Sequence, residues 1–142
     1  GNSDIYLYDL SKGEEKQITT NMSYQGHPSI SGDKIVWWDN RNGNSDIYLY
    51  DLSTGEEKQI TTDMSYQGYP SISGDKIVWE DFRNNLDNGN YDIYLYDLSK
   101  GEEKQITTDS YSQRVPSISG DKIVWLDKRN GVGDDIYMAI LS

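Results

Sequence analysis

The sequence predicts an all-β protein, a β-propeller built of four-stranded antiparallel blades, with about three blades in the chain. Nearly the same segment occurs three times, in copies that begin near Asp4, Asp46 and Asp92, and a terminal partial copy follows at 135–142. The copies are spaced 42 and 46 residues apart. Repeats of this length are typical of propellers and solenoids, in which each unit buries its apolar surface against its neighbours. No stretch has the i, i+3, i+4, i+7 apolar spacing of an amphipathic helix, so we expect essentially no helix. We treat residues 1–142 as a single repeat domain.

Each copy divides into four strand-like runs separated by turn residues. In the middle copy the runs are Tyr69–Ser73, Lys76–Asp81, Asp92–Asp97 and Lys104–Thr107. The sequences Ser-Gly-Asp and Ser-Lys/Thr-Gly-Glu between runs predict tight turns, because glycine readily adopts a positive φ. The runs are apolar on both faces, which is the pattern of a small sheet covered on both sides, as a propeller blade is.

The composition restricts the possible partners. The 142 residues include 24 acidic and 13 basic side chains, giving a formal net charge of −11, and there is no cysteine. Nucleic acids and anionic membranes are bound through clustered Lys and Arg, so we expect neither as a partner, and no apolar stretch is long enough for membrane insertion. Disulfides and thiolate metal sites are excluded. The chain opens inside a repeat without a signal peptide, which indicates an excised or recombinant piece rather than a natural start.

The repeats resemble those of TolB-like, WD40-like β-propeller proteins of bacterial and archaeal cell surfaces. The motifs that carry this resemblance are P-x-I-S-G-D-x-I-V-W, then W-x-D-x-R-N-G-N-x-D-I-Y-L-Y-D-L, as at 37–52, and then Q-I-T. They occur three times and cover practically the whole chain. The resemblance implies a propeller, often of six or seven blades, that serves as an interaction platform, a secreted or cell-surface location, and no catalytic apparatus. The copy at 135–142 lacks the Tyr-Asp pair, as at the end of an array.

Strand counting suggests how the chain closes a ring. Labelled A to D from the axis outward, the expected strands read CD, ABCD, ABCD and ABC, which is one strand more than three blades need. Three blades leave two unpaired ends, and exposed strand edges recruit other strands. We therefore expect a homodimer in which two chains build six blades and each junction holds one surplus copy of strand C. Other closures and a longer parent protein are the alternatives.

The longer connections differ most among the copies, and by strand parity they share one end of the blades, opposite the short turns. We expect this loop face to contact a protein or a carbohydrate, because tyrosine rings stack on ligands and glutamine amides form hydrogen bonds. The candidate binding residues are Tyr24, Gln25, His27, Tyr66, Gln67, Tyr69, Tyr111, Gln113 and Arg114.

One loop motif has a metal-binding alternative. Asp39 begins the sequence Asp-x-x-Asn-Gly-Asn-x-Asp, which places several oxygen atoms within a short segment, and Ca²⁺ prefers such ligands. Arg41 inside this motif is a poor neighbour for a divalent cation, and the spacing is not that of an EF-hand. We therefore expect Asp39 and its counterparts to brace the turn, and we expect no metal and no cofactor.

No catalytic signature is present. His27 is the only histidine, so no Ser-His-Asp set can repeat with the blades. The paired carboxylates of a glycoside hydrolase or lyase are a weaker alternative, with Asp39 and Glu80 as carboxylates on the loop face. Glu80 stands at a position that Trp38 and Leu126 occupy in the other copies. We therefore expect a non-catalytic, self-assembling interaction scaffold; the alternative is a purely structural or engineered repeat module without a ligand.

Overall fold

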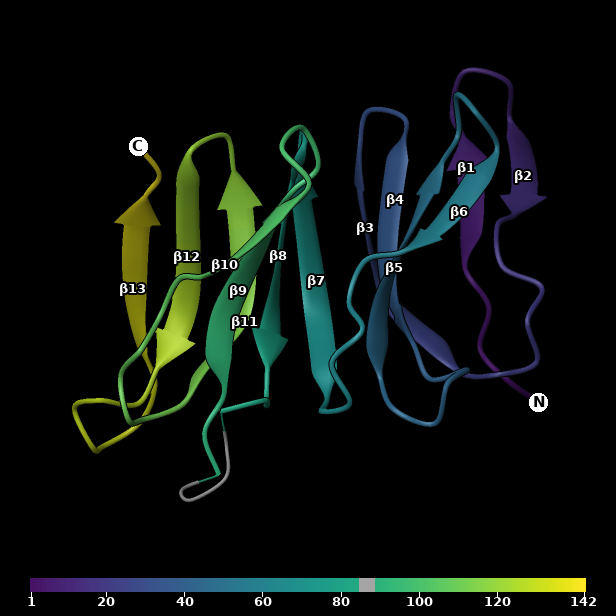
Figure 1. Ribbon diagram of the computed structural model, residues 1–142. Coiled ribbons are helices and arrows are strands. Elements are labelled where there is room, and N and C mark those ends of the chain that lie inside the picture. Colours follow the sequence, from purple (N-terminus) through teal and green to yellow (C-terminus); the bar gives the residue numbers. More distant parts are fainter. Residues whose placement is uncertain (85–88) are drawn as a thin grey trace.

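The computed structural model consists of four antiparallel sheets that stand side by side along the chain (Figure 1). It describes residues 1–84 and 89–142, so most of the four-residue insertion expected between 84 and 91 lies outside the described residues. The described part contains strands and no helix, and hence no helix that is long and apolar enough to cross a membrane. The all-β, four-stranded blade prediction is confirmed.

The strands follow the order expected from the repeats. The N-terminal pair holds two strands, the first and second blades hold four each, and the C-terminal sheet holds three. In chain order the strands are β1 (Tyr6–Asp9) and β2 (Glu14–Gln17); β3 (Gln25–Ser31), β4 (Lys34–Asp39), β5 (Asp46–Asp51) and β6 (Glu56–Gln59); β7 (Gln67–Ser73), β8 (Lys76–Asp81), β9 (Asp92–Asp97) and β10 (Glu102–Gln105); and β11 (Gln113–Ser119), β12 (Lys122–Asp127) and β13 (Asp135–Ile140).

Two kinds of short turn lie at one end of the blades, as strand parity predicts. Gly74 has a φ of 57° in the turn between β7 and β8, a conformation that glycine adopts without steric cost. Between β9 and β10 the Gly101 amide donates to the Asp97 carbonyl over 2.8 Å, and the Asp97 carboxylate accepts from the Ser99 amide. The longer connections gather at the opposite end, the lower one in Figure 1.

Two predicted boundaries were wrong by two residues. Strand β7 begins at Gln67 rather than Tyr69, because the chain pairs again before an irregularity between Gly68 and Ser71. Strand β10 is Glu102–Gln105 rather than Lys104–Thr107. The chain turns inward after Gln105, where the amides of residues 106 and 107 both donate to the carbonyl of Ile93.

Apolar side chains are buried between sheets, not within one sheet. The cluster between the first and second blades joins Val36 and Ile47 of one blade to Ile77 and Trp79 of the next, and all four are inaccessible to solvent. Equivalent clusters lie on either side, between the N-terminal pair and the first blade and between the second blade and the C-terminal sheet. Because burying one such side chain contributes about 1.5–3 kcal/mol, stability depends on contact between neighbouring sheets.

The first strands of the sheets form a continuous inner edge. The Ser29 hydroxyl of β3 accepts a hydrogen bond from the Ile72 amide of β7 over 3.2 Å. The Ser71 hydroxyl of β7 accepts from the Ile118 amide of β11 over the same distance. Strand A of each sheet is thereby attached to strand A of the next, as around the axis of a propeller.

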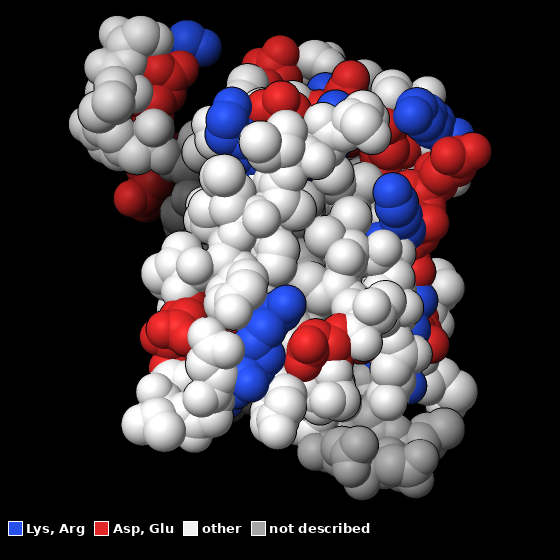
Figure 2. All heavy atoms as spheres, turned by 90° about the vertical axis from the view of Figure 1, so that its left-hand side faces the viewer, with Lys and Arg blue, Asp and Glu red and all other residues white. Residues whose placement is uncertain are grey.

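The N-terminal pair covers only part of the first blade, and no sheet among the described residues covers the far side of the C-terminal sheet. Ile30 on β3 is 54% exposed, whereas its counterpart Ile72 on β7 is 5% exposed. At the other end Val124 on β12 is 37% exposed, whereas Val36 on β4 is inaccessible. Figure 2 looks onto the β13 side, where uncharged residues form most of the face, basic and acidic side chains lie close together in its lower half, and other charged residues gather toward its borders. We call these two surfaces the N-terminal and C-terminal end faces.

Candidate functional site

The aspartates of the long-loop motif brace the turn after strand B. Asp39 is inaccessible to solvent, and its carboxylate accepts from the Arg41 guanidinium over 2.6 Å, from the Arg41 amide over 2.9 Å and from the Ser23 hydroxyl over 2.9 Å. Burial by itself would raise the pKa of Asp39, but these hydrogen bonds outweigh it and lower the pKa below the ordinary value. The corresponding bonds around Asp127, chiefly from Arg129, lower the pKa of that carboxyl to about 2. These carboxylates are held ionised by their own repeats.

The predicted binding glutamines are buried supports of the loops. Gln25, Gln67 and Gln113 each begin strand A and are at most 2% exposed. The Gln25 side-chain amide donates to the Ser23 carbonyl over 2.7 Å, and Gln67 donates to Ser65 in the same way. A ligand approaching this end of the protein therefore meets other side chains first.

A shallow groove of about 190 Å³ runs along the inner edge next to the loop face. Its walls are His27, Tyr69 and Val115, each followed by a proline. All three have a positive φ, between 48° and 52°, which is costly for side chains other than glycine and most of all for a β-branched residue. The rings of His27 and Tyr69 lie 4.1 Å apart between centroids. Left-handed backbone conformations of this kind are often found at ligand sites.

Glu80 contacts the groove residue Val115, is inaccessible to solvent, and has no basic partner from its own repeat among the described residues. Its Oε2 accepts from the Val115 amide of the neighbouring sheet over 2.9 Å. Its Oε1 lies 3.6 Å from Arg114 Nη2, which is an ion-pair distance but too long for a hydrogen bond. Burial raises the pKa of Glu80 because removal from water disfavours the charged form.

Two tyrosine rings and Arg114 form a cluster near Glu80. Tyr66 packs against Tyr91 edge to face, with 5.9 Å between centroids, and the Arg114 guanidinium lies 4.7 Å from the centre of the Tyr91 ring. A Cβ atom at Gly68 would lie 2.1 Å from the Tyr66 hydroxyl, so the absence of a side chain there makes room for the ring. Burial raises the pKa of Tyr66, and the charge of Glu80 raises it further. We call Tyr66, Glu80, Tyr91 and Arg114 the inner-edge cluster.

The remaining predicted residues lie at the surface of the loop face. Tyr24 is 55% exposed and Tyr111 is 52% exposed, and both precede strand A of their sheets. The structure thus brings His27 and Tyr69 together in the groove and Tyr66 and Arg114 together in the cluster. Tyr24 and Tyr111 stand apart from both, in different sheets.

No group of three or more His, Cys, Asp or Glu side chains in residues 1–84 and 89–142 is arranged to hold a metal ion. In the loop of the calcium alternative, Asp46 accepts from the side-chain amides of Asn42 and Asn44. These amides and Arg41 therefore already satisfy the carboxylates of the motif that a cation would need.

The family model of the TolB β-propeller domain matches residues 1–140. The chain belongs to the TolB β-propeller domain family. The predicted family resemblance is thus confirmed. No curated protein matches the chain in sequence.

Solved structures show the same architecture. TolB from Acinetobacter baumannii is 28% identical with a TM-score of 0.74, over 97% of this chain and 35% of that chain. A TolB-type protein from Agrobacterium tumefaciens is 24% identical with a TM-score of 0.78, over 99% of this chain and 53% of that one. The chain therefore spans between about a third and a half of these TolB structures. The β-propeller domain of the Trilobed protease from Pyrococcus furiosus, described as having an open velcro topology, is 17% identical with a TM-score of 0.68, over 95% of this chain and 40% of that chain.

Tyr91 was not among the predicted site residues, and the contact of Glu80 with the next sheet was not predicted. One signal was available, because a charged residue at a position that is apolar in the other copies requires a local partner. Tyr91 lies at the end of the variable insertion, at the position that Ser3 and Ser45 occupy in the other copies, so its ring has no counterpart there. The middle copy thus differs from the others at two residues, Glu80 and Tyr91, that contact the next sheet.

Proposed function

We propose that this TolB-like chain is a non-catalytic interaction scaffold that assembles with a second copy into a six-bladed ring and presents its loop face to a protein or a glycan. The proposal places it outside the cell or at the cell surface, as the family resemblance implies. The observation that carries it is the match between the two end faces. Each end face exposes one side of a contact between neighbouring sheets. The same contact is buried twice within the chain, between the first and second blades and between the second blade and the C-terminal sheet.

The match can be followed residue by residue. At the buried interfaces, Val36 and Val78 of strand B are inaccessible beneath Ile72 and Ile118 of the next sheet. On the C-terminal end face, Val124 stands at the position of Val36 and Val78. On the N-terminal end face, Ile30 stands at the position of Ile72 and Ile118. Exposed apolar side chains that gather on one face are typical of interaction sites. A second copy supplies both missing neighbours at once and removes the open ends.

The absence of catalysis is supported by the use of the carboxylates. Each repeated aspartate of the long loop is neutralised by an arginine two residues later, and Glu80 is inaccessible and binds a backbone amide. A glycosidase needs two carboxylates that face one substrate-accessible space. Loss of activity on changing Glu80 in a glycoside turnover assay would support the alternative of an enzyme.

Ring assembly is tested by the mass of the 142-residue chain in solution. We expect light scattering and sedimentation to give twice the chain mass. Ile30→Asp places a charge on the N-terminal end face without entering a core, so we expect this variant to be monomeric and folded. Met64→Asp is the matched control, because Met64 is exposed in the loop between the first and second blades, and its mass should equal that of the unchanged chain. A monodisperse monomer of the unchanged chain contradicts the ring.

Ligand binding is tested separately on the loop face. Tyr24 and Tyr111 are exposed, so their replacement by alanine removes stacking surface with little effect on the fold. We expect one or both variants to weaken the binding of a peptide or oligosaccharide found by array screening. If a defined dimer forms and no array ligand binds, the purely structural module is the better description.

A further inference from the structure

The ring contains one strand too many at each junction, and the structure indicates which one is displaced. We propose that β1 of a second copy pairs with β12 in place of β13, so that each junction blade consists of β11 and β12 of one chain and β1 and β2 of the other. This inference rests on the proposed ring. It makes the N-terminal pair a donated element and β13 a temporary cover of the C-terminal sheet.

Strand β1 already occupies the strand C position next to the first blade. The Gln25 amide donates to the Ser3 carbonyl, just before β1, over 3.2 Å. The same bond joins Gln67 to Ser45 over 2.9 Å, just before β5 in a complete blade. A β13 strand from another chain would have to enter a place that β1 of this chain fills.

Strand β1 also has the strand D partner that β13 lacks. The Ile5 amide donates to the Thr19 hydroxyl over 2.8 Å, and the Ile5 carbonyl accepts from the Ile18 amide over 2.8 Å. Ile47 makes the same two bonds with Thr61 and Ile60 in the first blade. The N-terminal pair is thus a finished outer half of a blade, and separating β2 from β1 would break these bonds.

The two strands cannot lie side by side in the usual way. Both are strand C of their repeats and run in the same direction, so direct pairing of β13 with β1 would be parallel. Every pairing between the described strands is antiparallel. One copy of strand C must therefore leave.

A lysine–tyrosine contact between neighbouring sheets favours β1. Lys16 of β2 lies 5.5 Å from the Tyr50 ring centre in the next sheet, and Lys58 of β6 lies 5.7 Å from the Tyr96 ring centre. Lys104 of β10 is the equivalent lysine at the interface between the second blade and the C-terminal sheet. The residue of strand C that it faces there is Ala139 of β13, which pairs with Ile123. In the first blade Tyr50 pairs with Ile35, the counterpart of Ile123. If β1 paired with β12 in the same register, Tyr8 would take the place of Ala139. Only β1 restores the cation–π contact.

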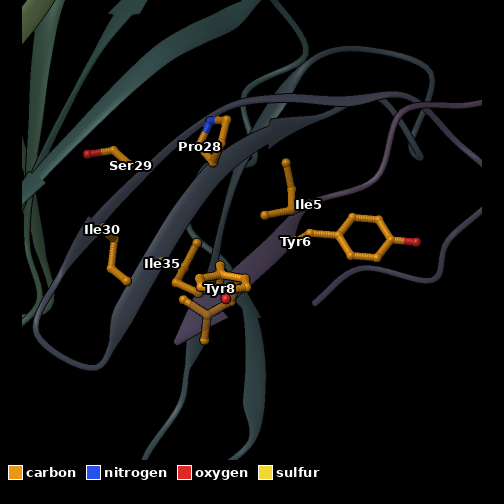
Figure 3. A pocket seen from close by; sticks show the side chains of 8 residues that line it. Ile5, Tyr6, Tyr8, Pro28, Ser29, Ile30 and Ile35 are labelled. Atoms are coloured by element: carbon orange, nitrogen blue, oxygen red, sulfur yellow. The ribbon is translucent and has the colours of Figure 1, made fainter. Parts of the chain in front are cut away.

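The N-terminal end face contains a hollow of about 180 Å³ that β12 can fill. Figure 3 shows Ile5, which precedes β1, and Tyr8 of β1 beside Ile30 and Ile35 of the first blade around this space. In the complete blades Val36 opposes Leu49 and Val78 opposes Leu95. With β1 of the second copy beside β12, Val124 opposes Leu7 and enters the hollow.

Paired cysteines distinguish the two arrangements, because the chain has no cysteine of its own. Leu7→Cys with Val124→Cys places thiols on directly opposed residues only if β1 of the second copy pairs with β12. Lys16→Cys with Met138→Cys places thiols on opposed residues only if β13 stays and β2 of the second copy pairs with it. This follows from the first blade, where Lys58 and Leu49, the counterparts of Lys16 and Met138, are paired. We expect the first double variant to form covalent dimers under mild oxidation and the second to show only the crosslinking of its single-cysteine controls.

The mass of the unchanged chain is measured first, so that the two proposals can fail separately. Absence of a dimer overturns the ring and this inference with it. A dimer that is crosslinked by the second cysteine pair, or by both pairs alike, overturns the displacement of β13 and leaves the ring intact. Crosslinking by the first pair alone supports both.

Two proline variants provide an independent measurement. The Leu141 amide donates to the Asp121 carbonyl over 2.7 Å and fastens β13, as the Leu52 amide fastens β5 to Asp33. Leu141→Pro removes this bond and should tighten the dimer several-fold, because the competing strand is weakened. In the proposed junction the Leu10 amide of the second copy would donate to the Asp121 carbonyl in place of the Leu141 amide. Leu10→Pro removes this bond and should weaken the dimer by about tenfold. The opposite order of affinities by sedimentation equilibrium overturns the inference.

Discussion

At the scale of single residues, the backbone of the inner edge is under strain that a substitution can relieve. Val115 has a φ of 52°, a left-handed conformation that is unfavourable for a β-branched side chain by about 1–2 kcal/mol, whereas asparagine adopts it more readily. We expect Val115→Asn to raise the free energy of unfolding by about 1 kcal/mol in urea titrations. Val132→Asn is the control, because this side chain is exposed in a loop and its replacement should change stability little. A loss of stability in Val115→Asn would mean that the valine side chain, not its backbone, is required.

Glu80 should give the protein a distinctive dependence on pH. Burial raises the pKa of Glu80 above the ordinary value of 4.5, so the folded protein binds this proton more tightly than the unfolded chain does. Its contribution to stability is therefore fully present below about pH 4.5 and is lost as the pH rises through the folded-state pKa. Glu80→Gln keeps an oxygen for the Val115 amide and removes the titration.

We expect the stability of Glu80→Gln to fall less between pH 4.5 and 7 than that of the unchanged chain, in thermal unfolding followed by circular dichroism. Glu14→Gln, which neutralises an exposed carboxylate on β2, should leave the profile unchanged. Parallel profiles for Glu80→Gln and the unchanged chain would show that Arg114 compensates the buried charge fully.

The sequence predicted residue roles well where they repeat and poorly where they do not. The Asp-Arg brace recurs in three copies and was recognised as structural from the pairing of charges alone. The burial of Gln67 was not predicted, because its side chain folds back on the preceding loop, where its amide donates to the Ser65 carbonyl, and no local pattern reports this. Glu80 and Tyr91 contact a different sheet, and single-chain spacing carries no information on such contacts.

At the scale of elements, the loop after strand B depends on the carboxylate that begins it. Asp39→Asn removes the charge that binds the Arg41 guanidinium, and a hydrogen bond to a charged group is worth about 1.5–3 kcal/mol. We expect a loss of stability of this size. Because hydrogen bonding lowers the pKa of Asp39, its contribution is present above the ordinary value of 3.8 and is lost on acidification. The variant should therefore differ from the unchanged chain at pH 7 and approach it near pH 2.

The same element provides a test of the calcium alternative. Millimolar calcium should leave the melting temperature of the unchanged chain where it is, because Asn42, Asn44 and Arg41 already satisfy the carboxylates. A rise with calcium that Asp39→Asn abolishes would show that a cation replaces these side chains, since a ligand that binds only the folded state stabilises it.

Strand order was predictable from the sequence and strand ends were less so. Apolar residues on both faces and glycine turns fix which segments pair, and the thirteen strands of residues 1–84 and 89–142 occur in the expected order. The inward turn after Gln105 depends on bonds to the Ile93 carbonyl in the neighbouring strand. Such bonds form only once the blade exists, so the run of residues up to Thr107 looked like a continuous strand.

At the scale of the whole molecule, net charge should oppose assembly while apolar contact drives it. Each chain carries a formal charge of −11, so two copies repel each other over distances comparable with the Debye length, which is about 30 Å at 0.01 M salt and 10 Å at 0.1 M. The end faces that meet are mainly uncharged. We therefore expect the dimer to tighten several-fold between low and physiological salt, as measured by sedimentation equilibrium. Ile30→Asp, which carries a charge into the end face, should stay monomeric at both salt concentrations. A dimer that loosens as salt is added would instead mean that oppositely charged groups at the border, such as Lys122 and an aspartate of the second copy, provide most of the attraction.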